Sequence, residues 1–139
     1  MVLAVPGGVA NIWGNLQSGS IVSEQSLPYP RPEWIKSHAE FFRDRFLPDM
    51  APCDDFSGPA CLKDRSGARY VFYAEDASSI DLELSSVEHA SRAIAVDTLR
   101  AYAEIELGTF RPSRQTWIAP YRSDWAIAVG DFPRLAAEE

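Results

Sequence analysis

The chain has 139 residues, of which 46% are hydrophobic and 24% are charged, and its formal net charge is −7. This composition is typical of a globular protein, and the length fits one domain or one domain with an extension. The negative charge argues against a nucleic-acid partner and against an anionic membrane surface, because both need a basic face. No apolar run approaches the roughly 20 residues that cross a membrane, so no membrane partner is expected.

The N-terminus and the cysteines bear on location and redox state. Residues 1–8 lack basic side chains and have only a short apolar run, which is not typical of a signal peptide, so we expect a cytoplasmic chain. Cys53 and Cys61 bracket a Ser-Gly-Pro turn, and a disulfide there would contribute roughly 2–3 kcal/mol. Without a signal peptide, two reduced thiols are the default expectation. These cysteines and the distant His38 and His89 make a poor zinc set, and no cofactor or metal is expected.

One helix is predicted, over residues 32–47. It follows a Gly-, Ser- and Pro-rich region in which only residues 2–5 have the texture of a short buried strand. Pro32 suits the first helical position because its missing N–H would be unpaired there, and Pro48 ends the helix. Helical spacing forms one mostly aromatic stripe from Trp34, Ile35, His38, Phe41, Phe42, Arg45 and Phe46. We expect this stripe to pack against a sheet.

The alternation of apolar and polar residues and the turn signals over residues 62–132 predict consecutive β-strands. Arg65-Ser66-Gly67 is a hairpin signal, and Ile80 and Leu82 alternate with acids, which indicates one buried and one wet face. The predicted strands are 70–73, 80–84, 93–96, 101–107, 115–118 and 125–129. Their spacing favours a mainly β (α+β) fold, an antiparallel sandwich or small barrel of about seven strands. The expected division is an N-terminal extension (1–61), a β-sandwich domain (62–132) and a tail (133–139).

The order of these motifs carries a family resemblance. A strand with Tyr70 and Tyr73 opens the region, and Asp124-Trp125-Ala126-Ile127-Ala128-Val129 closes it. This resembles the C-terminal β-sandwich attached to glycoside-hydrolase-like (β/α)8 barrels, a module sometimes named after collagen binding. Residues 7–14 and 32–47 look like the last barrel strand and helix. The earlier barrel strands, which carry the catalytic acid and base of such enzymes, are not among these residues. The resemblance therefore implies a non-catalytic module that steadies a barrel or holds a polysaccharide weakly.

The candidate binding residues are mostly aromatic, because sugar rings stack on flat aromatic faces while hydroxyls pair at the rim. They are Trp13, Trp117, Tyr121, Asp124 and Trp125. Trp13 precedes Gly14 and is expected on an open loop, where the resemblance would place it beside a sugar. Trp125 begins an apolar strand, so core packing is the competing interpretation for it.

Two other functions are compatible with the sequence. The first is a small hydrolase that uses a carboxylate pair, for which the candidate patch is Asp81, Glu83, Glu104 and Glu106. These acids would share one face if their strands were neighbours, and the competing interpretation is a solvated outer face. Close carboxylates would repel one another unless Arg69, Arg92 or Arg100 lay among them or a hard cation such as Ca²⁺ bridged them. The second function is a structural protein that forms a homo-oligomer through the helix stripe.

Overall fold

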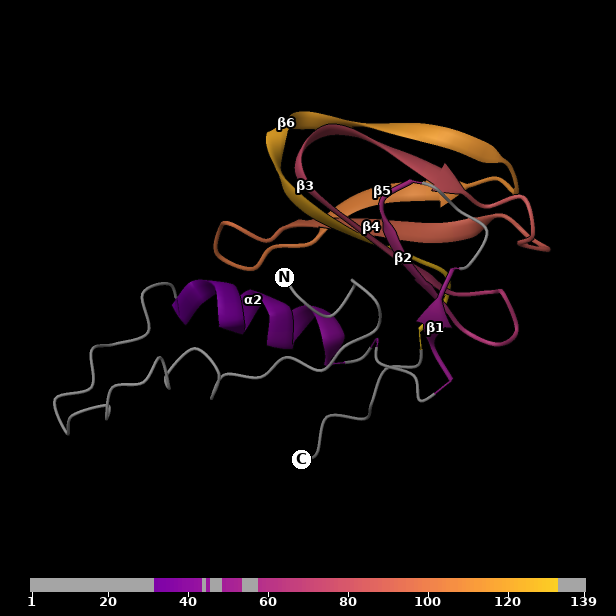
Figure 1. The fold of residues 1–139 in the computed structure, drawn as a ribbon, viewed down its shortest axis with the longest axis horizontal. Helices are drawn as coiled ribbons and strands as arrows, with labels where there is room; N and C mark the ends of the chain where they lie inside the picture. Colours follow the sequence, from indigo (N-terminus) through magenta and orange to yellow (C-terminus); the bar gives the residue numbers. More distant parts are fainter. Residues whose placement is uncertain (1–31, 44, 46–48, 54–57, 133–139) are drawn as a thin grey trace, which may run out of the picture.

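The computed structural model of the protein describes residues 32–132 except 44, 46–48 and 54–57. These described residues form one helix, α2 (Pro32–Phe42), and one open six-stranded antiparallel sheet (Figure 1). The strands are β1 (Ala51–Pro52), β2 (Ala60–Lys63), β3 (Tyr70–Glu83), β4 (Ser91–Asp97), β5 (Ile105–Phe110) and β6 (Arg114–Val129). Their order in the sheet is β1-β2-β3-β6-β4-β5. The prediction of a mainly β chain with one helix is confirmed.

The predicted two-sheet sandwich of about seven strands is replaced by a single sheet that folds over itself. Residues 70–73 and 80–84 were expected to be separate strands, but β3 runs through both, and β6 likewise joins 115–118 with 125–129. The register shifts between Ala74 and Ser79 of β3, where Asp76 has a positive φ of 48°. Such bulges bend a strand without ending it. Beyond the bulge, residues 79–83 of β3 pair with residues 114–118 of β6, and we call these segments the far halves of the two strands. Figure 1 shows them curving back above β4 and β5.

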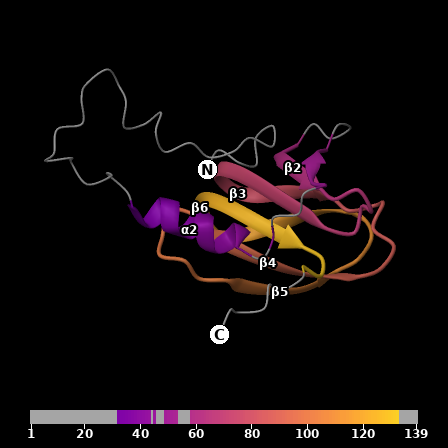
Figure 2. The same ribbon diagram turned by 90° about the horizontal axis from the view of Figure 1, so that it is seen from below.

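Two hydrophobic clusters lie on opposite faces of the sheet. One fills the space inside the fold, where Phe72, Ile127 and Val129 meet Ile80 and Leu82 from the far half of β3. The other includes Phe41 and Phe42 of α2, and Figure 2 shows this helix lying along one face of the sheet. Because both faces are covered, β4 and the near halves of β3 and β6 are buried on both sides, which explains their uninterrupted apolar runs.

The far half of β3 is buried on one face only. Ile80 and Leu82 are buried and Asp81 is exposed, so the predicted alternation is confirmed. The prediction for residues 101–107 is wrong in part, because the strand begins only at Ile105 and runs to Phe110. Ala101 and Ala103 precede the strand, in the β4–β5 connection, and both are exposed. Their small side chains have little apolar area to bury.

The helix begins at Pro32, as predicted, but ends at Phe42 rather than at residue 47. Phe41 and Phe42 are buried against the sheet, so the expected packing of the stripe is confirmed for these two residues. The Ser37 hydroxyl donates a hydrogen bond to the carbonyl oxygen of Arg100 at 3.0 Å, which ties the helix to the β4–β5 connection. No helix in the described part of the chain is long and apolar enough to span a membrane.

The predicted hairpin at 65–67 is confirmed as the β2–β3 turn. Gly67 has a φ of 71°, and its N–H donates to the Asp64 carbonyl oxygen at 3.1 Å. The Asp64 carboxylate is 3% exposed and accepts hydrogen bonds from the N–H groups of Ala68 and Arg69. The short side chain therefore organises the turn by satisfying backbone donors that the sheet does not reach.

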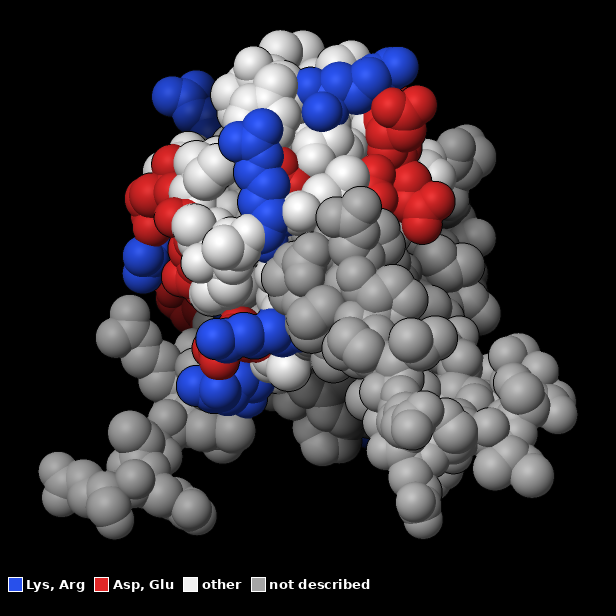
Figure 3. Space-filling view, turned by 90° about the vertical axis from the view of Figure 1, so that its left-hand side faces the viewer, with Lys and Arg blue, Asp and Glu red and all other residues white. Residues whose placement is uncertain are grey.

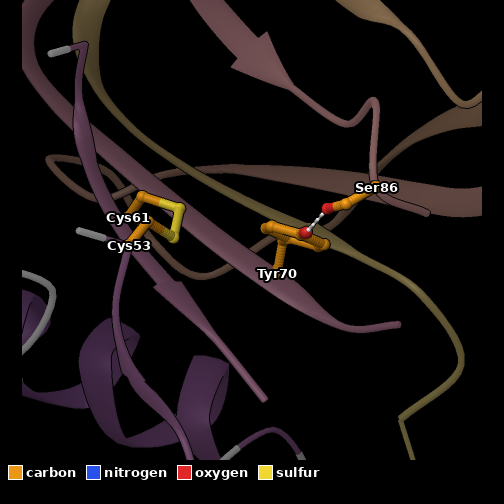
Figure 4. Close-up of a disulfide and its surroundings, with 4 residues drawn as sticks. All are labelled: Cys53, Cys61, Tyr70 and Ser86. Atoms are coloured by element: carbon orange, nitrogen blue, oxygen red, sulfur yellow. Dashed lines mark hydrogen bonds between the residues drawn. A yellow bond between two sulfur atoms is a disulfide. The ribbon is translucent and has the colours of Figure 1, made fainter. Parts of the chain in front are cut away.

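Cys53 and Cys61 form a disulfide, so the expectation of reduced thiols is wrong (Figure 4). The bond continues the β1–β2 pairing, because the Cys53 N–H also donates to the Cys61 carbonyl oxygen at 3.0 Å. Beside it, the Tyr70 and Ser86 hydroxyls lie 2.6 Å apart. The two-residue strand β1 is thus held covalently at the edge of the sheet. The cytoplasmic location itself stays a prediction.

Replacing both cysteines, in Cys53→Ser with Cys61→Ser, should lower the free energy of unfolding by about 2–3 kcal/mol, because the unfolded chain loses a short cross-link. Urea unfolding followed by circular dichroism measures the change. A reductant should destabilise the wild type to the level of the double variant and leave that variant unaffected. Equal stability of the oxidised and reduced wild type would contradict the expectation.

Candidate functional site

The β3–β6 bend gathers three of the predicted aromatic and acidic residues around a fourth. Trp125 is fully buried, and its indole N–H donates to the Tyr121 carbonyl oxygen at 3.1 Å. The ring of half-buried Trp117 lies edge-on, 5.2 Å from that of Trp125, and the Tyr121 ring lies 5.1 Å from it on a tilt. We call Trp117, Tyr121 and Trp125 the aromatic corner. The buried ring of Trp125 fixes the other two and presents no face to a ligand.

Arg100 completes the outer surface of the aromatic corner. Its guanidinium carbon lies 4.4 Å from the centre of the Tyr121 ring, while Tyr121 is 36% exposed. Burial, followed by the hydrogen bond to Asp97, raises the pKa of the Tyr121 hydroxyl. At neutral pH the phenol is protonated, as an ordinary tyrosine is, and it can act as a hydrogen-bond donor.

Asp97 is a residue of this region that the sequence prediction missed. It is 6% exposed, and its Oδ1 accepts hydrogen bonds from the Ser123 hydroxyl at 2.6 Å and from the Leu99 N–H at 3.0 Å. Its Oδ2 lies 3.3 Å from Arg100 Nε. The sequence signal for Asp97 was an acid directly after the apolar run of β4. Its partner Ser123 on β6 becomes a neighbour only because β4 pairs with β6, which the sequence does not show.

Asp124 lies at the bend and has a structural partner. Its Oδ1 accepts a hydrogen bond from the Asp76 N–H at 2.8 Å, which holds the bulge at its positive-φ residue. Its carbonyl oxygen accepts from the N–H of Thr98 at 2.9 Å. Burial and then the charge of Asp124 raise the pKa of Tyr73 to about 12. Asp124 therefore fastens the bend to the end of β4.

The surface at this end of the molecule carries both signs of charge. Figure 3 shows Lys and Arg side chains beside Asp and Glu side chains, around an uncharged area in the upper part of the view. Arg100 pairs with Asp97 at 3.3 Å, and Arg122 with Asp76 at 3.6 Å. Neither sign dominates, so a neutral polar ligand suits this surface better than a highly charged one.

The predicted carboxylate patch does not come together on neighbouring strands. Asp81 and Glu83 lie on β3, whereas Glu106 is on β5 and Glu104 directly precedes it; β6 and β4 separate these strands in the sheet. Each acid has a local partner. Asp81 accepts a hydrogen bond from Thr116, and Glu83 accepts one from Ser85. Glu104 pairs with Arg45, and Glu106 with Arg92.

The three glutamates of this patch have lowered pKa values. Hydrogen bonds from Ser85 lower the pKa of Glu83, and the hydrogen bond from Arg92 lowers that of Glu106. Burial alone would raise the pKa of Glu104, but hydrogen bonds from Tyr102 and Arg45 outweigh it and lower the pKa. A general acid in glycoside hydrolysis needs a raised pKa. These three glutamates therefore fit ion pairing better than proton donation.

The remaining candidates give no metal centre within the described residues. No group of three or more His, Cys, Asp or Glu side chains there is arranged to hold a metal ion. His89 is exposed in the β3–β4 connection. Trp13, the predicted strand 2–5, the tail 133–139 and the side chain of His38 lie outside the described residues.

The fold is similar to part of two solved glycoside hydrolases. No family model and no curated protein matches the chain. One structure, a glycoside hydrolase, has a TM-score of 0.59 and 10% identity over 70% of this chain. A second, a family 5 glycoside hydrolase from Bacteroides vulgatus, has a TM-score of 0.58 and 11% identity over 70% of this chain. The match spans 24% of each of those chains, and at such identity the likeness shows the fold alone.

Proposed function

We propose that the chain is a non-catalytic accessory module, resembling the C-terminal end of a glycoside hydrolase, that holds a polysaccharide weakly at the aromatic corner. The observation that carries this proposal is the fold, which matches a module-sized 24% of two glycoside hydrolases. The lowered pKa values of Glu83, Glu104 and Glu106 make these three glutamates poor candidates for the general acid of a hydrolase.

The chemistry of the aromatic corner supports weak sugar binding. Tyr121 and Trp117 offer partly exposed ring surface, which suits the apolar C–H face of a pyranose. The Arg100 side chain is 68% exposed and brings guanidinium donors beside the Tyr121 ring. A sugar bound there would receive hydrogen bonds from Arg100 at its hydroxyl rim while its flat face meets the aromatic rings. The small contact area predicts low affinity.

Titration with soluble polysaccharides, followed by tryptophan fluorescence, tests this proposal. A saturable change is expected because Trp125 lies 5.1 Å from the Tyr121 ring and reports on its surroundings. Tyr121→Ala should weaken binding by about tenfold or more, since the stacking surface is removed. Trp13→Ala tests separately whether Trp13 contributes.

Ile118→Ala is the matched control, because Ile118 is 70% exposed and follows Trp117, so its side chain points to the opposite face of β6. It should bind as the wild type does. Unchanged binding in Tyr121→Ala would overturn the assignment of the aromatic corner. The absence of a fluorescence change with xylan, mannan, β-glucan and pectin alike would overturn the proposed function.

A further inference from the structure

A groove on the α2 side of the sheet is separate from the aromatic corner and has a volume of about 380 Å³. It is lined by Arg45 beyond the helix, Arg92 and Ile94 of β4, Glu104 before β5, Ala128 of β6, and Phe132. We call it the Arg45–Arg92 groove. Its volume lies within the roughly 300–1,000 Å³ of small-molecule pockets.

The floor of the groove is apolar. Ile94 and Ala128 are buried members of the cluster on the α2 side, and Phe132 packs against that cluster while staying partly exposed. Because Ile94 and Ala128 are almost fully buried, the accessible apolar surface of the groove is the Phe132 ring, which suits the C–H face of a sugar.

The walls carry polar groups that are already fixed in place. Arg45 donates hydrogen bonds to the Phe41 carbonyl oxygen at 3.1 Å and the Tyr102 hydroxyl at 3.2 Å, and it pairs with Glu104. Arg92 donates hydrogen bonds to both carboxylate oxygens of Glu106, at 2.8 and 2.6 Å. A guanidinium has five N–H donors, so both arginines keep donors beyond these bonds. Glu104 accepts from Arg45 and Tyr102 on Oε1 alone, which leaves Oε2 as an acceptor.

The charges that line the groove nearly cancel. Two arginines face Glu104 and Asp131, and the pKa of Arg92 is raised first by its hydrogen bond and charge interaction with Glu106 and then, less, by the charges of Glu104 and Asp131. An anion or a cation would therefore meet a like charge wherever it met an opposite one. A pair of neighbouring hydroxyls suits this wall, because one oxygen accepts from a guanidinium while the other O–H donates to a carboxylate.

We infer that the Arg45–Arg92 groove is a second ligand site, which binds one neutral pyranose-type sugar ring with its C–H face on Phe132. The ring's hydroxyls pair with the Arg45, Arg92 and Glu104 side chains. The site extends the proposed polysaccharide binding to another face of the module, and its test is independent of the aromatic corner.

Titration of isotope-labelled protein with glucose, galactose, mannose, xylose and their β-linked disaccharides, followed by amide NMR shifts, tests the inference. At least one neutral sugar should cause saturable shifts at residues 92–94, 104–106 and 128–132. Arg92→Met should weaken that binding by about tenfold or more, because it removes donors while keeping the stem. Arg92 is 58% exposed, so this variant is expected to fold.

Arg114→Met is the matched control, because Arg114 is exposed and is not among the residues that line the groove. It should bind as the wild type does, and so should Tyr121→Ala, which disables only the aromatic corner. Glucuronate and glucosamine should bind more weakly than glucose. Shifts confined to the aromatic corner would overturn the groove while supporting the proposed function. Retained binding in Arg92→Met, or no shifts at the groove up to about 50 mM sugar, would also overturn it.

Discussion

Replacing Trp125 by alanine should lower the free energy of unfolding by about 3–5 kcal/mol, the range for truncating a large buried aromatic residue. Trp125 is 0% exposed, and it lies at the bend where the two halves of β6 meet. Its loss would leave a cavity between the Trp117 and Tyr121 rings and would remove the hydrogen bond to the Tyr121 carbonyl oxygen. The cavity and the lost hydrogen bond both lower the free energy of unfolding.

Urea unfolding followed by far-ultraviolet circular dichroism measures this loss, because fluorescence itself changes when a tryptophan is removed. Trp117→Ala is the matched control: the same residue type is only partly buried there, so the loss should be clearly smaller. Trp125→Phe should lie between the wild type and Trp125→Ala, since it fills part of the cavity. A loss below about 1 kcal/mol for Trp125→Ala would contradict the central position of this ring in the core.

The elements that the sequence predicted well are those in which local pattern and tertiary setting agree. Residues 80–84 alternate because one face of the far half of β3 is wet, and the apolar run 93–96 becomes the buried centre of β4. Pro32 starts the helix by local backbone chemistry alone. These signals need no knowledge of which strand is the neighbour.

The bend of β3 and β6 could not be predicted from local pattern. Residues 75–79 and 119–124 have the Asp, Ser and Pro content of loops, but they lie opposite one another and the sheet carries both through the bend. Bulge pairing is a property of two segments more than 40 positions apart, and neither segment shows it alone. The prediction of separate strands at 70–73 and 80–84, and at 115–118 and 125–129, and that of a two-sheet sandwich were wrong for this reason.

The candidate site was predictable only in its aromatic part. Trp117, Tyr121 and Trp125 are close in the sequence and in space, so a search for clustered aromatics finds them. The contact between Asp97 and Ser123 and the groove between Arg45 and Arg92 depend on the order of strands in the sheet. Glu104 and Glu106 were grouped with acids of β3 because alternation gives the face of a residue but not the neighbouring strand.

Replacing Asp64 by alanine should lower the free energy of unfolding by about 1–3 kcal/mol, because a hydrogen bond to a charged acceptor contributes roughly 1.5–3 kcal/mol and these bonds are only partly buried. The variant removes the acceptor of the N–H groups of Ala68 and Arg69 in the β2–β3 turn. It also removes the ion pair to Arg69 at 3.1 Å. Asp49→Ala is the matched control: this exposed carboxylate accepts one N–H, that of Arg65, from the same turn, so its loss should cost less.

The contribution of Asp64 should depend on pH in a defined direction. Burial alone would raise the pKa of this carboxyl, but hydrogen bonds from Ser66, Arg69 and Ala68 outweigh it and lower the pKa below its usual value. The native state therefore favours the ionised form, and the stabilisation is complete above the unfolded-state pKa. It is lost as the pH falls through the folded-state pKa.

Asp64→Asn isolates this effect, because the amide keeps one acceptor oxygen and cannot titrate in this range. The difference in unfolding free energy between the wild type and Asp64→Asn should be constant near neutral pH and should shrink as the pH falls from about 5 towards 2. Urea unfolding at a series of pH values measures it. A difference that does not change over this range would mean that the carboxyl has the same pKa in the folded and unfolded chain. In that case the network of hydrogen bonds around Asp64 would hold the turn by geometry alone, without favouring the charged form.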